Sequence, residues 1–283
     1  MRNLLIIGCG DIGLRAAHLL AGHYRLFALS HSPERFAALR ETGVTPIYGD
    51  LDRPGSLVRI AGIAQDVLHL APPGNSGKED IRTRNLLAAL SKGDIVPQRL
   101  VYISTSGVYG DCAGEHVAET RKVVPQTERA ARRLDAERRI RLWGGKNGVK
   151  VCLLRVPGIY SKERISLSRL SLPVLVESED VYTNHIHAED LARIVTCALH
   201  HGLNGRIYNV SDDSSMKMGE YFDFLAKKYD LPVPSRLPRE ALRQVVPESM
   251  YSFMSESRRM DNARMKKELG ISLKYPRVSD GVR

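Results

Sequence analysis

A glycine-rich turn near the N-terminus constrains the fold of this chain more than any other feature. A short aliphatic run at residues 4–7, typical of a buried parallel strand, leads directly into the sequence GCGDIG at residues 8–13. Apolar residues at helical spacing follow over residues 14–21, so the glycines stand at a strand-to-helix junction. At such a junction the first glycine permits a tight turn, the second lets the backbone approach a pyrophosphate, and the third lets helix and strand pack closely.

This junction predicts a dinucleotide-binding site. The N-terminus of the helix supplies free N–H groups and the positive end of a dipole for the phosphates. We expect the cofactor to contact the turn residues Gly8, Gly10, Asp11, Ile12 and Gly13. The alternative is a glycine-rich turn without a ligand, and the preceding strand, the following helix and the N-terminal position favour binding.

Predicted strands and helices alternate along the rest of the N-terminal half. Strands are expected over residues 24–29, 45–48, 67–71, 99–104 and 151–156, and helices over residues 33–41, 81–90 and 127–143, the last closed by Gly144. Strands separated by helices imply right-handed crossovers. The sequence therefore predicts an α/β fold of Rossmann type, with a doubly wound parallel sheet.

The pattern loosens past Pro157. One more strand is expected over residues 207–210 and a helix over residues 218–229, before a proline-rich stretch. We expect a dinucleotide-binding domain over residues 1–160, to which residues 184–211 return, and a smaller C-terminal lobe formed mainly by residues 161–283. This lobe should bind the substrate, because ligands of open α/β sheets bind at the carboxyl edge of the sheet.

Composition places the chain among ordinary globular proteins. Its 283 residues are 43% hydrophobic, enough for one large core or for a core and a smaller lobe. No stretch approaches the roughly 20 consecutive apolar residues of a membrane span, and the apolar run at residues 4–7 is too short for a signal peptide. We therefore expect a cytoplasmic protein that binds no membrane. Free thiols, without disulfides or a metal site, are expected at Cys9, Cys112, Cys152 and Cys197.

The net charge of +10 is concentrated in two segments. Six arginines lie on the helix expected over residues 127–143, and a second basic group follows over residues 258–267. Aromatic residues are not interleaved with these charges as they are in a nucleic-acid stacking platform. Solvated helix faces are the first explanation and a site for phosphorylated ligands the second, so we expect no nucleic-acid partner.

Several segments together resemble one protein family. They comprise residues 8–13, 49–51, 67–71, 101–111, 154–160 and 185–191. In this order and spacing they are similar to the extended short-chain dehydrogenases/reductases, and more narrowly to the NAD-dependent epimerases and dehydratases that act on nucleotide sugars. The segment over residues 262–281 resembles the ending of a branch of nucleoside-diphosphate-sugar epimerase-like proteins. The resemblance covers nearly the whole chain.

The resemblance implies further contacts with the cofactor. Asp50 matches the aspartate that contacts the adenine in the family, although it would serve equally well as a turn residue. Leu51, on the same segment, is expected beside it. After the fourth strand, Leu70, Ala71 and Pro72 are expected to border the dinucleotide.

The end of the second strand indicates which dinucleotide is bound. An NAD site carries an acidic residue there, about 20 residues beyond the glycines, for the ribose hydroxyls. This chain has no carboxylate at that place and offers Ser30, His31, Ser32 and Arg35. These donors and charges suit a 2′-phosphate, so we expect NADP(H) to be favoured over NAD(H). Ser32 would also cap the helix that begins at Pro33.

The chain departs from the family at the catalytic pair. The family's Tyr-x-x-x-Lys pair falls at Arg129 and Arg133. The family tyrosine acts as a general acid/base because a neighbouring lysine and the oxidised nicotinamide lower its pKa. Arginine stays protonated in proteins and cannot replace it. Either the chemistry differs or the protein binds without turnover.

Other residues are candidates for the missing role. Thr105 falls where the family places the Ser/Thr that holds a substrate oxygen, or it only satisfies backbone groups at a strand end. Tyr109, Tyr160 and Tyr182 lie in segments that should border the same cleft, where a tyrosine is more often a packing surface. We expect His187 to be a turn or capping residue, since no cluster at ligand spacing makes a metal site.

These observations support two classes of function. The first is an NAD(P)-dependent epimerase, dehydratase or reductase that acts on a nucleotide sugar or a related polyol. The second is a dinucleotide-binding sensor or scaffold that has lost the acid/base pair. For the oligomeric state we expect a monomer or a homodimer, because the helices over residues 81–90 and 127–143 often form a dimer in the family, whereas the arginines of the second would repel each other there.

Overall fold

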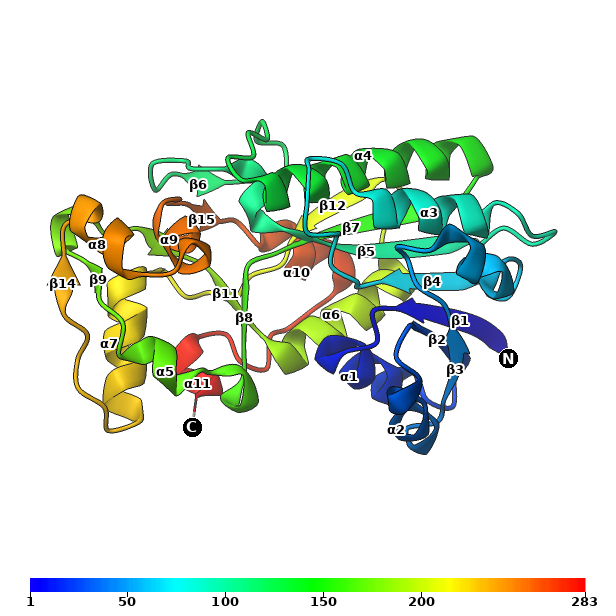
Figure 1. The fold of residues 1–283 in the computed structure, drawn as a ribbon, viewed down its shortest axis with the longest axis horizontal. Helices are drawn as coiled ribbons and strands as arrows, with labels where there is room; N and C mark the ends of the chain where they lie inside the picture. The colour runs from blue at the N-terminus through cyan, green and yellow to red at the C-terminus, as the bar shows by residue number, and fades with distance from the viewer. Residues whose placement is uncertain (283) are drawn as a thin grey trace.

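The computed structural model describes residues 1–282, except for the side chain of residue 249, and is built on one parallel sheet. In spatial order its seven strands are β12 (Arg206–Asn209), β7 (Lys150–Val156), β5 (Arg99–Thr105), β4 (Asp66–His69), β1 (Arg2–Ile7), β2 (Tyr24–Ser30) and β3 (Val44–Tyr48). All neighbours in this sheet are parallel. The predicted α/β fold of Rossmann type is thus confirmed (Figure 1).

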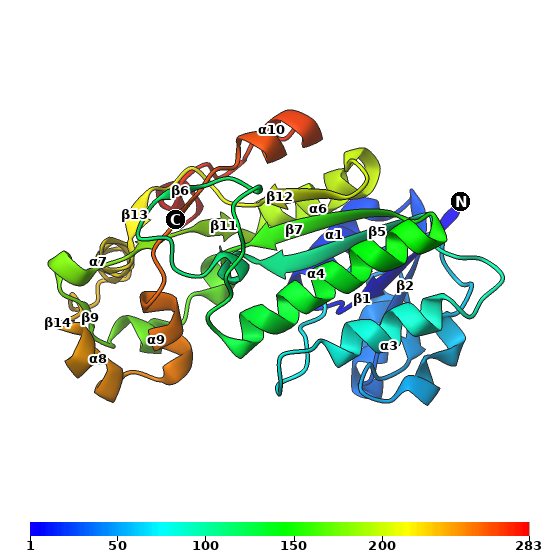
Figure 2. The same cartoon turned by 90° about the horizontal axis from the view of Figure 1, so that it is seen from above.

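Helices cover both faces of the sheet. One face packs against α1 (Asp11–Leu20), α6 (Ala188–His201) and α10 (Ala263–Leu269), and the other against α3 (Ile81–Leu90) and α4 (Glu128–Asn147). The short α2 (Phe36–Glu41) lies beyond β2 and is preceded by a 3₁₀ turn at Pro33–Arg35. Figure 2 shows α3 and α4 side by side on one face of the sheet.

The two cores follow from the alternation of side chains along each strand. Leu4 and Ile6 of β1 face the core under α1 and α6, while Leu5 and Ile7 face the core under α3 and α4. A strand buried on both faces must be apolar throughout, which is why β1 reads as a continuous aliphatic run.

A smaller lobe lies beyond the carboxyl ends of the strands (Figure 1). Its helices are α5 (Leu167–Leu170), α7 (Met218–Lys228), α8 (Arg239–Val245), α9 (Glu248–Met254) and α11 (Val278–Gly281). Four short strand pairs support it: β8 (Gly158–Tyr160) with β11 (His185–His187), β9 (Val174–Leu175) with β14 (Arg236–Leu237), β10 (Tyr182–Thr183) with β13 (Met216–Lys217), and β6 (His116–Val117) with β15 (Arg259–Met260). Its separate apolar core centres on α7 and β9.

Two features bear on the expected organisation of the chain. Besides residues from the 184–211 segment, Met265, Leu269 and Ile271 also pack into the core under α1 and α6. The arginines of α4 are not all on a solvated face, since Arg132 is buried and donates to the carbonyl of Gly77. Arg138 and Arg141 are exposed.

The end of α4 also differs from the expected one. The helix continues through Gly144 to Asn147 and ends at Gly148, which has the left-handed conformation. Gly144 is required for close packing instead, because a Cβ there would lie 2.5 Å from Cγ1 of Val151 on β7. The predicted end of the helix at Gly144 is therefore wrong, because this glycine serves packing within the helix.

Two further expectations concern cysteines and membrane spans. All four cysteines are free thiols, and Cys9, Cys112 and Cys152 are buried. Within residues 1–282, no helix combines the length and the apolar character needed to cross a membrane.

Candidate active site

The glycine turn has the geometry expected of a phosphate-binding junction. Gly8 has a φ of +85°, and a Cβ there would lie 2.5 Å from the backbone nitrogen of Ala71, so the turn packs directly against the loop after β4. Gly13 lies against the carbonyl of Gly8. A Cβ on Gly10 would meet no atom within 4 Å, so the space beside the middle glycine is open. Gly10 is also the N-cap of α1, and no side chain caps that end.

Charged side chains surround the first turn of α1. Asp11 accepts hydrogen bonds from Arg15 at 2.7 Å and from Arg164 at 3.0 Å. Although partial burial opposes the effect, these two guanidinium groups lower the pKa of Asp11. Ile12, the next residue, is buried in the core. The carboxylate is therefore ionised at neutral pH beside the expected phosphate site.

The residues expected at the adenosine end lie around the tip of β2. Arg35 donates from Nη2 to the carbonyl of Cys9 at 2.8 Å, which places its exposed side chain next to the glycine turn. His31 is exposed, and the backbone N–H of Ser32 donates to the hydroxyl of Ser30. The side chain of Ser32 does not cap the following helix.

The loops after β3 and β4 carry the remaining residues expected to contact the cofactor. Asp50 accepts a hydrogen bond from the backbone N–H of Asp52, as a turn residue does, and its side chain is partly exposed. Leu51 and Ala71 are buried, Leu70 is half-buried and Pro72 is exposed. The resemblance assigns all of them to the cofactor, and their contacts with it stay a prediction.

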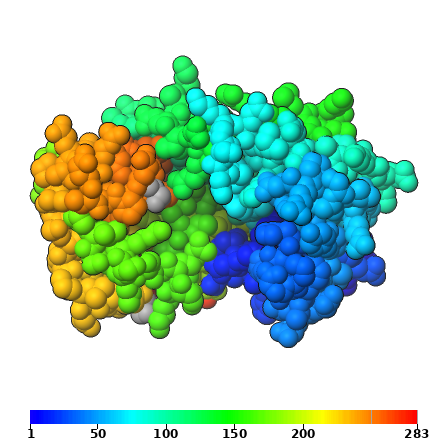
Figure 3. All heavy atoms as spheres, in the orientation of Figure 1, coloured from blue at the N-terminus to red at the C-terminus, as the bar shows by residue number. Residues whose placement is uncertain are grey.

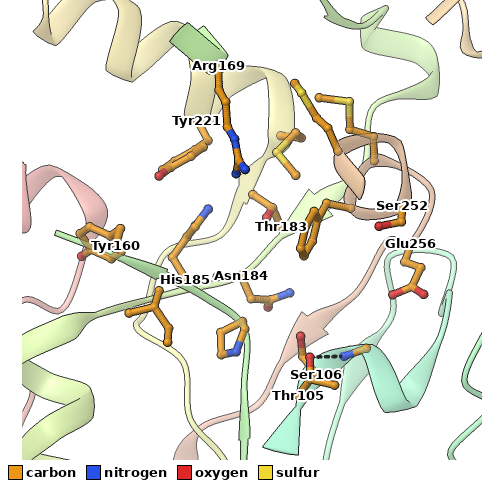
Figure 4. Close-up of a pocket in the computed structure, with 18 of the residues that line it drawn as sticks. Thr105, Ser106, Tyr160, Arg169, Thr183, Asn184, His185, Tyr221, Ser252 and Glu256 are labelled. Atoms are coloured by element: carbon orange, nitrogen blue, oxygen red, sulfur yellow. Dashed lines mark hydrogen bonds between the residues drawn. The ribbon is translucent and has the colours of Figure 1, made fainter. Parts of the chain in front are cut away.

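A pocket of about 590 Å³ lies between the sheet and the smaller lobe. The surface is hollowed where the N-terminal half meets this lobe (Figure 3). The lining comes from the end of β5, the first turn of α4, β8, α5, β10, β11, α7 and α9. Figure 4 shows Arg169 extending from α5 into the pocket between Tyr221 and Thr183, with Thr105 at the opposite end.

Thr105 ends β5 beside Val156 of β7 and lines the pocket. Its hydroxyl oxygen accepts a hydrogen bond from the backbone N–H of Gly107 at 3.2 Å (Figure 4). The hydroxyl proton is not used in that bond, so Thr105 can still donate to a ligand oxygen. Thr105 can therefore accept a hydrogen bond from the backbone and donate one to a ligand at the same time.

Both arginines at the positions of the family's catalytic pair line the pocket. Arg133 is firmly held, because its Nη1 donates to the carbonyl of Ile103 at 2.7 Å and to the hydroxyl of Tyr102 at 3.1 Å. Arg129 lies over the ring of Phe253 on α9, at 4.7 Å from the ring centroid. The guanidinium of Arg133 is therefore held in place by hydrogen bonds, whereas that of Arg129 is held, among the described residues, only by its contact with the ring.

A buried network fixes the position of α4 on the sheet. Glu137 of α4 accepts a hydrogen bond from Ser104 at 2.5 Å and pairs with Arg155 of β7 at 2.8 Å, and all three side chains are buried. This network lies one turn beyond Arg133 and two turns beyond Arg129. It thereby sets how far both arginines reach toward the pocket.

The structure removes Tyr109 from the candidate acid/bases. Its side chain is 1% exposed, its hydroxyl donates to Asn209 at 2.7 Å, and it does not line the pocket. The hydroxyl of Tyr160 likewise donates away from the pocket, to the carbonyl of Arg277. The ring of Tyr182 does border the pocket, beneath the guanidinium of Arg259.

The two histidines of β11 have different roles. As expected, His187 caps α6, since its Nδ1 accepts a hydrogen bond from the backbone N–H of Glu189. His185 lines the pocket and stacks on Tyr221, with ring centroids 4.1 Å apart. Burial lowers the pKa of His185 to about 3, so its imidazole is neutral. No group of potential metal ligands occurs within residues 1–282.

Sequence reasoning missed several pocket residues. Arg258 reaches the pocket from the C-terminal part of the chain and pairs with Glu256 at 2.7 Å. Arg164 and Arg169 come from the segment after β8. The basic composition of these segments was the only available signal, and it did not indicate which side chains face inward.

Comparisons with known proteins agree with this geometry. A sequence model of the NAD dependent epimerase/dehydratase family matches residues 4–211. The GDP-6-deoxy-D-mannose reductase of Pseudomonas aeruginosa is 24% identical over 272 residues, which cover 86% of this chain and 87% of that protein.

Solved structures share the fold. A conserved protein from Silicibacter pomeroyi DSS, 24% identical, superposes with a TM-score of 0.81 over 100% of this chain and 97% of that one. DesIV, a dTDP-glucose 4,6-dehydratase from Streptomyces venezuelae, is 19% identical and superposes with a TM-score of 0.79 over 99% and 94%. From the match over residues 4–211 we conclude that the chain belongs to the NAD dependent epimerase/dehydratase family.

Proposed function

We propose that this protein is an NAD(P)-dependent enzyme that epimerises, dehydrates or reduces a nucleotide sugar. One observation carries the substrate class: two guanidinium groups, those of Arg129 and Arg169, line the pocket and form no ion pair within the described residues. Among residues 1–282, the side chain of Arg169 makes no hydrogen bond or ion pair, and that of Arg129 stacks on Phe253 and lies in the field of Glu256 without forming an ion pair with it. Guanidinium groups match the geometry of phosphate oxygens, so a diphosphate is the ligand group that these two would take.

The bound cofactor and individual residues of the chain would supply the other functions that the reaction needs. The bound dinucleotide would supply the acceptor or donor of a hydride. Thr105 would donate a hydrogen bond to an oxygen of the sugar, and Arg133 would hold a positive charge at the boundary between the cofactor and the sugar. Because residue 129 cannot accept a proton, proton transfer in this protein would not depend on that position.

The relatives support this proposal. The Pseudomonas protein is a reductase named for a GDP-6-deoxy sugar, and the Streptomyces structure is a dehydratase named for a dTDP sugar. We place the reaction in the cytoplasm, where four unpaired cysteines stay reduced.

The test is a panel of UDP-, GDP- and dTDP-sugars with oxidised and reduced NAD and NADP. Nicotinamide absorbance reports net oxidation or reduction, and product analysis by mass spectrometry reports epimerisation or dehydration. We expect turnover with at least one sugar. Binding of the dinucleotide without turnover of any sugar would support the second candidate, a sensor or scaffold, which Arg129 at the tyrosine position favours.

We also infer that NADP(H) is preferred over NAD(H). The support is the absence of a carboxylate at residues 29–32 together with the position of Arg35 beside the glycine turn. One charge-assisted contact with the 2′-phosphate contributes about 1.5–3 kcal/mol, which is at least a tenfold preference. Titrations of NADPH and NADH into wild type and Arg35→Gln test this, and Arg40→Gln on the following helix α2 is the control. Equal affinities in the wild type would contradict it.

A further inference from the structure

Four charged side chains join the first turn of α1 to the segment after β8. Asp11 pairs with Arg15 and with Arg164, and Arg15 also reaches Glu163 at 3.4 Å. Asp11 and Arg164 are 153 residues apart in sequence. We call Asp11, Arg15, Glu163 and Arg164 the bridge cluster. It connects the dinucleotide-binding domain with the chain that forms one wall of the pocket.

The bridge cluster lies at the expected pyrophosphate site. Asp11 is the first residue of α1 and directly follows Gly10, beside which there is open space. Arg164 ends a 3₁₀ turn at Lys162–Arg164 and lines the pocket. In Figure 3 the dark blue surface of the first residues meets the green surface of this segment below the hollow.

The charges at this place are unusual for a phosphate site. A helix N-terminus with free N–H groups attracts anions, yet here the ionised carboxylate of Asp11 stands beside it and would repel a pyrophosphate. The arginines offset this repulsion. Arg164 has five N–H donors and uses one of them, toward Asp11 at 3.0 Å. Its side chain is 37% exposed, so it is free to turn toward a second anion.

We propose that Arg164 belongs to the dinucleotide site and contacts the pyrophosphate of the bound cofactor, and that its charge offsets the repulsion between Asp11 and that pyrophosphate. Residues 165–170 follow Arg164, and Arg169 on this segment lines the far end of the pocket. Cofactor binding would therefore fix the pocket wall that carries Arg169 before the substrate enters. This inference rests on the dinucleotide part of the proposed function and is independent of the substrate.

The first measurement compares dinucleotide affinities of wild type and Arg164→Gln by fluorescence titration with NADPH and NADH. Because a charge-assisted contact with phosphate is lost, we expect both dissociation constants to rise ten- to a hundredfold at low ionic strength. The difference should shrink as salt is added. Lys162→Gln is the matched control, since it removes a charge from the same exposed turn. Affinities within twofold of wild type in Arg164→Gln would overturn the proposal.

The second measurement separates binding from a structural role of the ion pair. In Asp11→Asn the repulsion is gone and Arg164 remains, so we expect NADPH to bind as tightly as in wild type or more tightly. If Asp11→Asn weakened NADPH binding as much as Arg164→Gln, the pair would only hold the fold, and the proposal would fail. Melting temperatures of both variants should stay near that of wild type, because exposed ion pairs contribute little stability.

The outcomes distinguish this inference from the proposed function. Dinucleotide binding by wild type with no effect of Arg164→Gln would overturn the inference alone. A lack of turnover with every sugar would leave it standing and overturn only the substrate assignment. A wild type that binds neither NADPH nor NADH would overturn both.

Discussion

At the scale of single residues, the three glycines of the turn differ in what surrounds them. Gly8 and Gly13 are enclosed by protein atoms, whereas a side chain at position 10 would point into open space. That space is available to a ligand. The sequence motif alone does not separate a packing glycine from a binding glycine, and the structure does.

We predict that Gly10→Val abolishes dinucleotide binding without loss of stability. A Cβ at position 10 meets no protein atom within 4 Å, and the valine side chain would fill the space that the pyrophosphate needs. Titration with NADPH and thermal unfolding measure the two effects. The control is Gly8→Ala, which is expected to unfold at a lower temperature because its φ of +85° and its contact with Ala71 exclude a Cβ. Unchanged NADPH affinity in Gly10→Val would contradict the assignment of the turn.

A second residue-scale prediction concerns the charges at positions 129 and 133. Two permanent positive charges in the pocket disfavour the cationic oxidised nicotinamide, so wild type should bind NADPH more tightly than NADP⁺. Arg129→Gln and Arg133→Gln should each narrow that difference. Only Arg133→Gln should also lower the free energy of unfolding, by about 1–3 kcal/mol, since it removes the donor to the carbonyl of Ile103. Equal affinities for both redox states in all three proteins would argue against an electrostatic role.

At the scale of elements, replacing either of two adjacent glycines in α4 by alanine should change stability in opposite directions. Gly144 faces Val151 of β7 at a distance that excludes a Cβ, while Gly145 faces open space. We predict that Gly144→Ala lowers the free energy of unfolding by about 1–3 kcal/mol through overpacking. Gly145→Ala should raise it by about 0.5–1 kcal/mol, because alanine is the better helix former. Urea unfolding of both variants measures this. A stabilised Gly144→Ala would mean that α4 can move away from β7.

Helices and strands could be predicted from the sequence where the local pattern of apolar residues determines them. The aliphatic run of β1 and the alternation of strands and helices gave the sheet, since a strand buried on both faces must be apolar throughout. The end of α4 was not predictable, because the role of Gly144 depends on β7, a different element. Arg164 and Arg169 were missed for the same reason: their positions depend on contacts between residues far apart in sequence.

At the scale of the whole molecule, the smaller lobe and the domain built on the parallel sheet are interleaved in sequence. The chain leaves the sheet after β7, returns for α6 and β12, and returns again for α10. Asp212 lies just after β12, where its backbone N–H donates to the carbonyl of His185. Asp212 and His185 thus meet at this point, while His69 is buried in β4, and these buried titratable groups make the stability of the whole molecule depend on pH.

Three buried groups have opposing effects on that dependence. Burial lowers the pKa of His69 and of His185 to about 3. The unfolded chain therefore takes up protons at these histidines as the pH falls below about 6.5, and the folded protein loses stability. Burial raises the pKa of Asp212 to about 7. In the unfolded chain Asp212 has already released its proton above about pH 4. The contribution of Asp212 to the free energy of unfolding therefore falls as the pH rises from about 4 to 7 and is constant above that pH.

We therefore predict that Asp212→Asn becomes more stable relative to wild type as the pH is raised. The asparagine cannot ionise, so it avoids the cost of a buried charge, and the difference in unfolding free energy should grow by on the order of 3–4 kcal/mol between pH 4 and pH 8. Urea unfolding of both proteins across this range measures the difference and cancels the contributions of His69 and His185. Asp213→Asn is the control with the opposite sign: although partial burial opposes it, hydrogen bonds from Asn262 and Lys266 lower the pKa of Asp213, so this variant should lose stability relative to wild type as pH rises through the acid range. A difference for Asp212→Asn that stays constant from pH 4 to pH 8 would show that Asp212 ionises in the folded protein as readily as in the unfolded chain.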